Sequence, residues 1–293
     1  MATNTLGGVN LAKIAQKSLD AITTQLIGLQ ALTLDFSDEI KSEGDSVTTR
    51  VATSPTVKSA STTRSSDNST LTAKTVTLNK FQMFDIGFKD LEIAKSSVKL
   101  ENLFIKPGVV ALVEDMYATM FALCLNANFP LNKIYTSSQY DADAAVDLAT
   151  YMSTNKIPSG PRTVIVPPSY YGNLAKDNAV QAAYAFGNND AIINRQVKRV
   201  AGLDHMEFNG TIPGNSENLV GFAAGPQAIL MAARFPAMPE QWYGLVENVV
   251  EPVTGLPIQF RYFYDGNEQR LQAIILYGMA VGQATNGVRI LSA

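Results

Sequence analysis

Residues 46–77 read SVTTRVATSPTVKSASTTRSSDNSTLTAKTVT, and no other part of the chain has so unusual a composition. Of these 32 residues, 17 are Ser or Thr, and no aromatic side chain occurs between Phe36 and Phe81. Both ends alternate as β-strands do, whereas Ser54-Pro55 and residues 65–68 are typical of turns. The pattern predicts a long two-stranded hairpin with a Ser/Thr-rich tip, and a disordered linker is the alternative.

This hairpin has little apolar surface of its own to bury. Ordering one residue costs roughly 1–2 kcal/mol of backbone entropy, and an isolated two-stranded hairpin is marginal in water. We therefore expect the hairpin to be ordered when it lies on another surface. Lys58, Arg64 and Lys74 give it a mild basic excess, which is usual for a solvated face and could also meet an acidic surface on a neighbouring copy.

Amphipathic patterns flank the hairpin on both sides. Over residues 9–32, apolar side chains recur at three- and four-residue steps, which predicts a helix. Its apolar stripe either packs on its own domain or forms an arm that docks on a neighbouring subunit. Residues 78–93 combine alternation with apolar clustering and predict a strand in a packed sheet.

A long helix is predicted over residues 107–126, with Pro107 at its first position. Its apolar face consists of Val109, Leu112, Val113, Met116, Met120, Leu123 and Cys124. Glu114 and Asp115 interrupt the apolar run, and a central acidic residue costs about 2.5–3.5 kcal/mol on membrane insertion. The run therefore indicates a core helix and not a membrane span. Because the two acids are adjacent, their side chains diverge, which favours solvation or an ion pair between subunits over acid–base catalysis.

Shorter elements follow this helix. Helices are expected over residues 141–154, 169–176, 179–186, 192–197 and 227–233, and strands over residues 162–166, 202–208, 218–222, 258–264 and 270–277. Ser138 or Asp141 is expected to cap the first of these helices, and Ser169 the second. The last two strands are expected to form a hairpin through the turn at residues 265–267.

The overall composition is that of a folded globular protein, since 46% of the 293 residues are hydrophobic and 17% are charged. With 23 basic and 26 acidic residues the net charge is −3, which excludes a polycationic nucleic-acid binder. The single cysteine excludes an intrachain disulfide and a Cys-based zinc site, and the single histidine excludes paired-His metal motifs. The N-terminus has no positive start followed by an apolar run, so no targeting segment is expected.

Motifs that carry chemistry are missing from the sequence, and we expect no catalytic, cofactor or metal site. Phosphate-binding glycine loops and the G-x-S-x-G nucleophile elbow do not occur. His205 follows Asp204, but a lone histidine in a strand is more often structural than part of a Ser-His-Asp site. Asp141, Asp143 and Asp147 lack the glycine and bidentate glutamate of a calcium loop and fit the first turns of a helix better.

The order of short sequence stretches along nearly the whole chain is informative. The stretches are EGDSV (43–47), FDIGF (84–88), the helix from Pro107, VIVPPSYY (164–171), VAGLD (200–204), Gly221-Phe222 with residues 225–230, and LYGMA (276–280). In this order they resemble the major capsid protein of tailed bacteriophages, which has the HK97-like fold. The resemblance implies an α+β fold and a structural protein that is not an enzyme.

The same resemblance implies a division of the chain into four regions. They are an N-terminal arm (1–37), an E-loop hairpin (38–82), a peripheral domain (83–129 and 233–280) and an axial domain (130–232 and 281–293). The peripheral domain would contain a spine helix at residues 107–126. The axial domain would cluster around the five-fold and six-fold axes of an icosahedral shell.

The implied partners are other copies of the chain, assembled as pentamers and hexamers around double-stranded DNA that they enclose without reading its sequence. Portal and decoration proteins are further implied partners, and no membrane is involved. The arm helix starts near residue 9, which leaves no room for a fused scaffold and suggests a separate scaffolding protein or none. The expected location is the virion, after assembly in the bacterial host cytoplasm. Lys58 could be nominated for a covalent cross-link, but no motif marks its partner, so this activity is not expected.

Two other functions remain open from the sequence. An encapsulin-like compartment has the same fold and holds protein cargo. A soluble α+β enzyme with the Ser/Thr-rich segment as a mobile lid would instead form small oligomers and have a pocket around His205.

Overall fold

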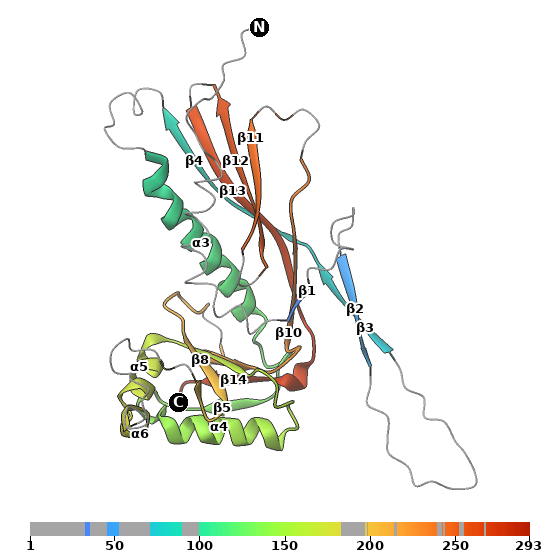
Figure 1. The fold of residues 1–293 in the computed structure, drawn as a ribbon. Helices are drawn as coiled ribbons and strands as arrows, with labels where there is room; N and C mark the ends of the chain where they lie inside the picture. Colours follow the sequence, from blue (N-terminus) through green and yellow to red (C-terminus); the bar gives the residue numbers. More distant parts are fainter. Residues whose placement is uncertain are drawn as a thin grey trace, which may run out of the picture.

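The computed structural model describes residues 33–35, 46–52, 71–89, 100–182, 197, 199–213, 216–238, 242, 244–251, 255–266 and 268–293. These residues form a sheet of longer strands (the large sheet), a sheet of shorter strands (the small sheet) and a separate hairpin. One long helix lies along the large sheet and reaches the small sheet with its end (Figure 1). The α+β class expected from the sequence is confirmed. The predicted arm helix over residues 9–32 and the hairpin tip lie outside the described residues.

The large sheet is built around the 14-residue strand β13 (Glu268–Val281). In the described chain its order is β1-β10-β13-β12-β11, and β4 pairs with β13 as well. The other members are β1 (Thr33–Asp35), β4 (Lys80–Lys89), β10 (Ile229–Arg234), β11 (Leu245–Val250) and β12 (Pro257–Asp265). All its pairs are antiparallel except β1 with β10. The predicted C-terminal hairpin is confirmed as β12 and β13.

Helix α3 (Leu100–Ala122) lies along one face of this sheet and points toward the small sheet (Figure 1). Its 23 residues correspond to a length of about 34 Å. The predicted apolar face is confirmed, since Val109, Met116 and Met120 are fully buried. The placement of Pro107 was wrong, because the helix begins seven residues earlier and Pro107 lies inside it. Proline has no N–H, so this interior position lacks one helical hydrogen bond, which the packed face compensates.

The small sheet has the order β5-β14-β9-β6-β8-β7 among the described residues. Its strands are β5 (Asn132–Ile134), β6 (Thr163–Val166), β7 (Arg199–Val200), β8 (Leu203–Glu207), β9 (Leu219–Ala224) and β14 (Gly287–Leu291). One face packs against α4 and α5, and the other against the end of α3. Two short 3-10 helices, Ser137–Gln139 and Ala284–Asn286, complete the connections. The strands predicted at 162–166, 202–208 and 218–222 are confirmed as β6, β8 and β9.

Three helices accompany the small sheet, and their ends test the predicted caps. Asp141 caps α4 (Ala142–Thr154), as predicted, by accepting a hydrogen bond from the Ala144 N–H at 2.9 Å. The Ser169 cap was wrong, because α5 (Pro168–Lys176) starts one residue earlier with a proline in its first turn. Helix α6 (Asn178–Ala182) covers the described part of the helix predicted at 179–186. Of the helix predicted at 192–197, only Val197 is described.

The helix predicted over residues 227–233 was wrong, since this segment contains strand β10 (Ile229–Arg234). A short apolar run between turn residues has the same appearance in a buried helix and a buried strand. Here β10 fits between β1 and β13, and five of its six residues are buried. A turn with Gln227 at φ 59° precedes the strand.

The two strands of the predicted hairpin are confirmed. β2 (Ser46–Ala52) and β3 (Leu71–Thr77) pair antiparallel over their full lengths, with Ser46 opposite Thr77 and Ala52 opposite Leu71. The described hairpin lies beside the large sheet near β10 and β13 (Figure 1). After a two-residue connection, the chain continues from β3 into β4 and so joins the large sheet.

Candidate assembly surfaces

The root of the hairpin is anchored on its own subunit by a small apolar cluster. Val47 and Val76, which pair across the hairpin, are 8% and 4% exposed and pack against Leu230 and Ala232 of β10. On the other face of the hairpin the hydroxyls of Thr48 and Thr75 are exposed and lie 3.2 Å apart. One face of the root is therefore fixed to the body, and the opposite face carries hydroxyls toward solvent.

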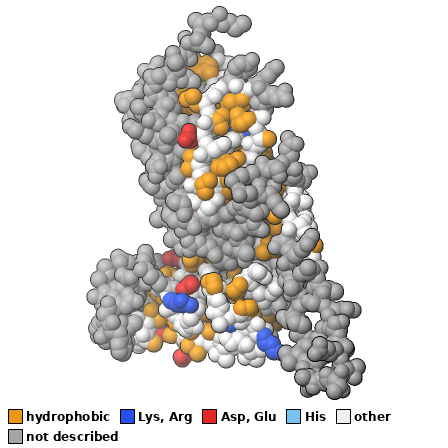
Figure 2. All heavy atoms as spheres, turned by 45° about the vertical axis from the view of Figure 1, so that its right-hand side comes forward, with side chains coloured by type: hydrophobic (Ala, Val, Ile, Leu, Met, Phe, Trp, Pro, Cys, Tyr) orange, Lys and Arg blue, Asp and Glu red, His pale blue; other side chains and the backbone are white. Residues whose placement is uncertain are grey.

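Strand β4 presents large apolar side chains to solvent on the face away from α3. Phe84 contacts α3, and successive side chains of a strand point to opposite faces, so Phe81 and Met83 point away from the helix. These two side chains are 52% and 50% exposed. Figure 2 shows patches of hydrophobic side chains on the upper half of the molecule, where the large sheet lies. Exposed apolar side chains on a sheet are typical of an interaction surface when they are grouped.

A row of polar side chains crosses this same face of the large sheet. Asp85 accepts hydrogen bonds from Arg270 Nη1 at 3.1 Å and from Gln272 Nε2 at 2.9 Å. On the next strand, Arg261 Nε donates to Gln259 Oε1 at 2.7 Å, and burial lowers the pKa of this guanidinium. The polar groups are thus paired within the sheet, which keeps their desolvation from destabilising it.

The end of the β12–β13 hairpin is acidic. Arg270 lies 3.6 Å from Asp265, 3.7 Å from Glu268 and 3.1 Å from Asp85, so three carboxylates surround one guanidinium. All three pairs are partly solvated, and exposed pairs of this kind typically contribute about 0.2–1 kcal/mol each. Lys89 lies opposite Glu268 in the sheet, so three acidic and two basic side chains meet at this end, and their pairs contribute little to stability.

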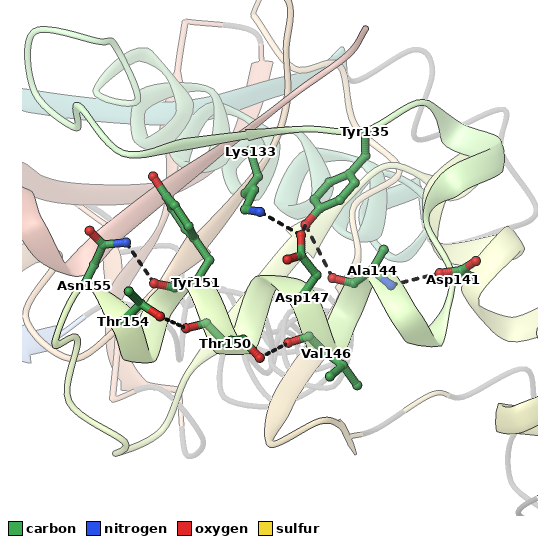
Figure 3. Close-up of polar contacts among 10 residues, drawn as sticks. All are labelled: Lys133, Tyr135, Asp141, Ala144, Val146, Asp147, Thr150, Tyr151, Thr154 and Asn155. Carbon is green, nitrogen blue, oxygen red and sulfur yellow. Dashed lines mark hydrogen bonds and ion pairs between the residues drawn. The ribbon is translucent and has the colours of Figure 1, made fainter.

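A second polar surface lies on α4 and the neighbouring strand β5 (Figure 3). Asp147 of α4 accepts hydrogen bonds from Lys133 Nζ and from the Tyr135 hydroxyl, both at 2.8 Å. These two bonds, with Lys133 first, lower the pKa of the Asp147 carboxyl. The pKa of Tyr135 is raised, mainly by burial and then by Asp147. The contact joins the edge strand β5 to the helix.

The threonine hydroxyls on the outward side of α4 are used within the helix. Thr150 donates to the Val146 carbonyl at 2.8 Å, and Thr154 donates to the Thr150 carbonyl at 2.9 Å (Figure 3). Val146 itself is 52% exposed. The outward side of the helix therefore combines methyl groups with the exposed carboxylates of Asp143 and Asp147.

The structure gives His205 a structural environment. The side chain is buried on β8, with Nδ1 3.1 Å from the Leu203 carbonyl oxygen and its ring centroid 6.1 Å from that of Tyr140. Burial lowers the pKa of His205 to about 4, so the ring is neutral at pH 7. Asp204 lies 3.7 Å from Arg199 on the exposed side of the strand. No Ser-His-Asp arrangement forms around His205 within the described part of the chain.

The acidic residues considered in the sequence have separate structural positions. Asp141 caps α4, whereas Asp143 is exposed in its first turn and Asp147 pairs with β5. Among the residues that the structure describes, no group of three or more His, Cys, Asp or Glu side chains could hold a metal ion. Asp115 accepts a hydrogen bond from the buried Tyr277 hydroxyl at 2.8 Å, and Glu114 is exposed, so the two side chains diverge as expected.

Two further expectations concern basic residues and the single cysteine. Lys58 and Arg64 lie outside the described residues, and Lys74 is half-buried on β3. Cys124 is fully buried, as predicted, and burial raises the pKa of its thiol. The predicted helix end at residue 126 was wrong, because α3 ends at Ala122 and Cys124 lies just beyond it. Among the residues that the structure describes, no helix is long and apolar enough to cross a membrane.

The sequence did not reveal three features of these surfaces. The partners of the hairpin root were hidden because β10 was predicted as a helix. The exposure of Phe81 and Met83 was hidden because an alternating strand does not indicate which face is covered. The buried residue Arg289 gave no signal, since its partners lie 72 and 163 residues away in sequence.

Comparisons with known proteins identify the fold. No protein-family model matches the chain, and no curated protein sequence matches it. Among solved structures, a chain of Mycobacterium phage Che8 is similar with a TM-score of 0.61 and 18% identity, over 90% of both chains. The capsid of cyanophage P-SCSP1u has a TM-score of 0.58 and 14% identity, over 90% of this chain and 86% of that one. A virus-like particle from Pyrococcus furiosus has a TM-score of 0.57 and 12% identity, over 96% and 100%.

The chain has the HK97-like fold of viral capsid proteins. The solved structures that share this fold with it are structural capsid proteins and not enzymes. The fold resemblance stated from the sequence is therefore confirmed over nearly the whole chain.

Proposed function

We propose that this chain is the major capsid protein of a tailed bacteriophage, and that pentamers and hexamers of it form an icosahedral shell around double-stranded DNA. The observation that carries the proposal is the hairpin. Its root is bound to its own subunit through Val47 and Val76, in a chain whose fold is that of capsid proteins. A hairpin that is held on its own subunit at its root can contact another copy with the residues beyond the root.

We propose the same four regions as above, with three boundaries adjusted to the sheets. The regions are the arm (1–37), the E-loop (38–82), the peripheral domain (83–129 and 233–280) and the axial domain (130–232 and 281–293). However, β4 begins at Lys80, β10 begins at Ile229 and β13 ends at Val281, and all three strands belong to the large sheet. These three positions are better domain limits than residues 83, 233 and 280, because a limit inside a strand would divide a sheet.

The proposed mechanism is assembly through many modest contacts. The arm and the hairpin of each copy lie across its neighbours, and binding orders them. Linked contacts raise the effective concentration of each further contact, so no single interface has to be tight. The basic residues Lys58, Arg64 and Lys74 of the hairpin would meet the acidic end of the β12–β13 hairpin of a neighbour. A net charge of −3 also suits a shell that encloses DNA without gripping it.

The proposal includes further partners and a location. A portal and decoration proteins would bind the assembled shell, and the shell would be part of the virion after assembly in the host cytoplasm. The exposed apolar side chains Phe81 and Met83 are available for contacts with other copies.

A compartment that holds protein cargo is the second candidate function. The similarity to a virus-like particle from Pyrococcus furiosus, which covers 96% of this chain, favours it. Nuclease treatment of native particles separates the two functions, because a virion protects a genome and a protein compartment does not. Particles that contain protein and no protected DNA would contradict the virion.

The hairpin's role is tested by deleting residues 53–70, which lie between the two paired strands. We expect a folded subunit with unchanged circular dichroism that forms no closed shells in electron micrographs. Glu114→Lys, on the exposed side of α3, is the control and should leave assembly intact. Normal shells from the hairpin deletion would contradict the proposed role.

A further inference from the structure

The described chain passes between the two sheets at three places. Residues 123–131 lead from α3 to β5, residues 225–228 from β9 to β10, and residues 282–286 from β13 to β14. The angle between the sheets depends on how these crossings are held.

Two of the crossings are bound to each other as a ribbon. The Gly225 N–H donates to the Asn286 carbonyl at 2.8 Å, and the Gln283 N–H donates to the Gln227 carbonyl at 2.8 Å. Gln227 has a φ of 59°, in the left-handed region that non-glycine residues rarely adopt. A β-carbon at Gly282 would collide with the Gln227 carbonyl oxygen, so the two segments can approach this closely only with glycine at that position.

The third crossing is held by one buried cation, Arg289 of β14, which is 2% exposed. Its Nε donates to the Phe129 carbonyl and its Nη2 to Asn126 Oδ1, both at 2.7 Å. Its Nη1 pairs with the carboxylate of Glu217, which also accepts the Asn126 N–H at 3.1 Å. The backbone N–H of Arg289 also donates to the Leu131 carbonyl at 2.9 Å. Arg289 therefore joins the segment after α3 to the turn before β9.

The remaining contact between the sheets is an apolar core with several aromatic rings, among them Phe129 and Phe222 with ring centroids 4.9 Å apart. Phe208 lies with its ring centroid 4.7 Å from Tyr117 and 5.4 Å from Phe121, at the end of α3. Apolar contact has no preferred direction, so it tolerates a small rotation of one body on the other. The hydrogen bonds of a guanidinium are directional, so they do not tolerate such a rotation.

The turn that carries Glu217 has a defined backbone conformation. Asn218, the neighbour of Glu217, has a φ of 55°, in the left-handed region that asparagine adopts more readily than other non-glycine residues.

We propose that Arg289 and Glu217 form a latch that fixes the angle between the two sheets. With the latch closed, residues 123–131 are held against β14. With the latch open, this segment separates from β14 and the α3 end slides over Phe208. The latch does not depend on the proposed function; in a shell it would set the curvature of each copy.

Cys124 provides a direct measurement of latch opening. It is the only cysteine of the chain, is fully buried, and lies in the crossing that Arg289 holds, with Sγ 3.5 Å from the Met120 carbonyl oxygen. A thiol reagent can reach it only when the segment opens. The experiment measures the labelling rate of the native chain at pH 8 with an excess of 5,5′-dithiobis(2-nitrobenzoic acid).

For Glu217→Gln, which removes one charged partner of Arg289, we expect labelling at least about tenfold faster, as the loss of a charge-assisted hydrogen bond implies. Asp147→Asn removes the same charge from a surface pair on α4 and is the matched control, with an unchanged rate. Asn126→Ala removes a single bond of the latch and should give an intermediate rate if Glu217→Gln does not fold.

Hydrogen exchange of the β12 and β13 amides distinguishes the latch from general destabilisation. We expect these amides to exchange at the wild-type rate in Glu217→Gln. A labelling rate equal to that of the wild type, or faster exchange of β12 and β13 in proportion to the labelling, would overturn the proposal. Both readouts use the unassembled chain, so a failure of the latch and a failure to form shells are seen separately.

Discussion

Val47 and Val76 face each other across the hairpin, and both are buried against Leu230 and Ala232 of the large sheet. This contact is the described link between a hairpin that has little core of its own and the body of the subunit. Burying a side chain of this class contributes roughly 1.5–3 kcal/mol. The contact is therefore large enough to hold the root of the hairpin on the body of the subunit.

The double substitution Val47→Ser with Val76→Ser should release the root while the body stays folded. We expect the midpoint of thermal unfolding to change little, because the hairpin is a local unit with its own opening equilibrium. Limited proteolysis should cut the hairpin faster, and shell yield should fall. Thr75→Ala, on the exposed face of the same strand, should change neither. Uncut hairpin and full shell yield in the double variant would show that the contact is dispensable.

Gly108 lets α3 approach β4 closely. A β-carbon at this position would lie 2.8 Å from Phe84 Cγ, so Gly108→Ala should destabilise the protein although alanine favours helix. We expect a net loss of about 1 kcal/mol, since overpacking costs about 1–3 kcal/mol and the helix gains about 1 kcal/mol. Equilibrium unfolding in urea measures this loss of stability.

Adding Phe84→Ala, which removes the Cγ and Cδ atoms that the new β-carbon would meet, to Gly108→Ala should remove the collision. The two substitutions together should then cost less than the sum of their separate costs, by at least about 0.5 kcal/mol. Additive costs would mean that the helix does not press on the Phe84 ring.

His205 should make the protein less stable in mild acid. Its folded pKa of about 4 lies below the unfolded value of 6.5, so between these values the unfolded chain binds the proton and the folded chain does not. Stability from His205 is therefore full above about pH 7 and falls as the pH falls toward 4. At pH 5 the loss is roughly 2 kcal/mol, from one proton over about 1.5 pH units.

The His205→Phe variant isolates this effect, because it keeps a ring against Tyr140 and cannot take up a proton. Asp147, whose pKa is lowered, also loses stabilisation in acid, but equally in both proteins. Urea unfolding at pH 7 and pH 5 should show a gap between the two proteins that widens by roughly 2 kcal/mol toward acid. A difference in stability that is the same at pH 7 and pH 5 would contradict the burial of His205, since it would mean that the ring takes up a proton equally well in the folded and unfolded chains.

Assembly should be sensitive to salt and to the charge of the β12–β13 end. Glu268→Lys should reduce the shell yield if the basic hairpin docks near Asp265 and Glu268 of a neighbour. The Debye length falls from about 10 Å at 0.1 M salt to about 3 Å at 1 M, so wild-type assembly should slow over this range. Light scattering measures the rate of shell assembly. Glu114→Lys, on the exposed side of α3, is the control. Equal effects of the two substitutions would contradict a specific contact.

The sequence correctly predicted those elements whose local residue pattern is compatible with only one type of secondary structure. The alternating ends of the hairpin, the apolar face of α3 and the Asp141 cap all follow from local spacing, and the structure has them. Residues 229–234 could not be assigned in this way, because a run of five apolar residues fits a buried helix and a buried strand equally. Only the pairing with β1 and β13, which is distant in sequence, decides between them.

The candidate surfaces were less predictable than the fold. Exposure of Phe81 and Met83 depends on which face of the sheet α3 covers, and the sequence of β4 alone does not contain that information. Pro107 was placed by a statistical preference for the first helical position, which the packing of α3 overrides. The latch around Arg289 joins segments from distant parts of the chain, so local spacing gave no sign of it.

The most direct test of the account is cryo-electron microscopy of the purified, full-length chain under assembly conditions. The account predicts closed icosahedral shells in which the hairpin of each copy, rooted at Val47 and Val76, extends over an adjacent copy. A population of separate subunits or small oligomers, with the hairpin folded back on its own large sheet, would contradict it.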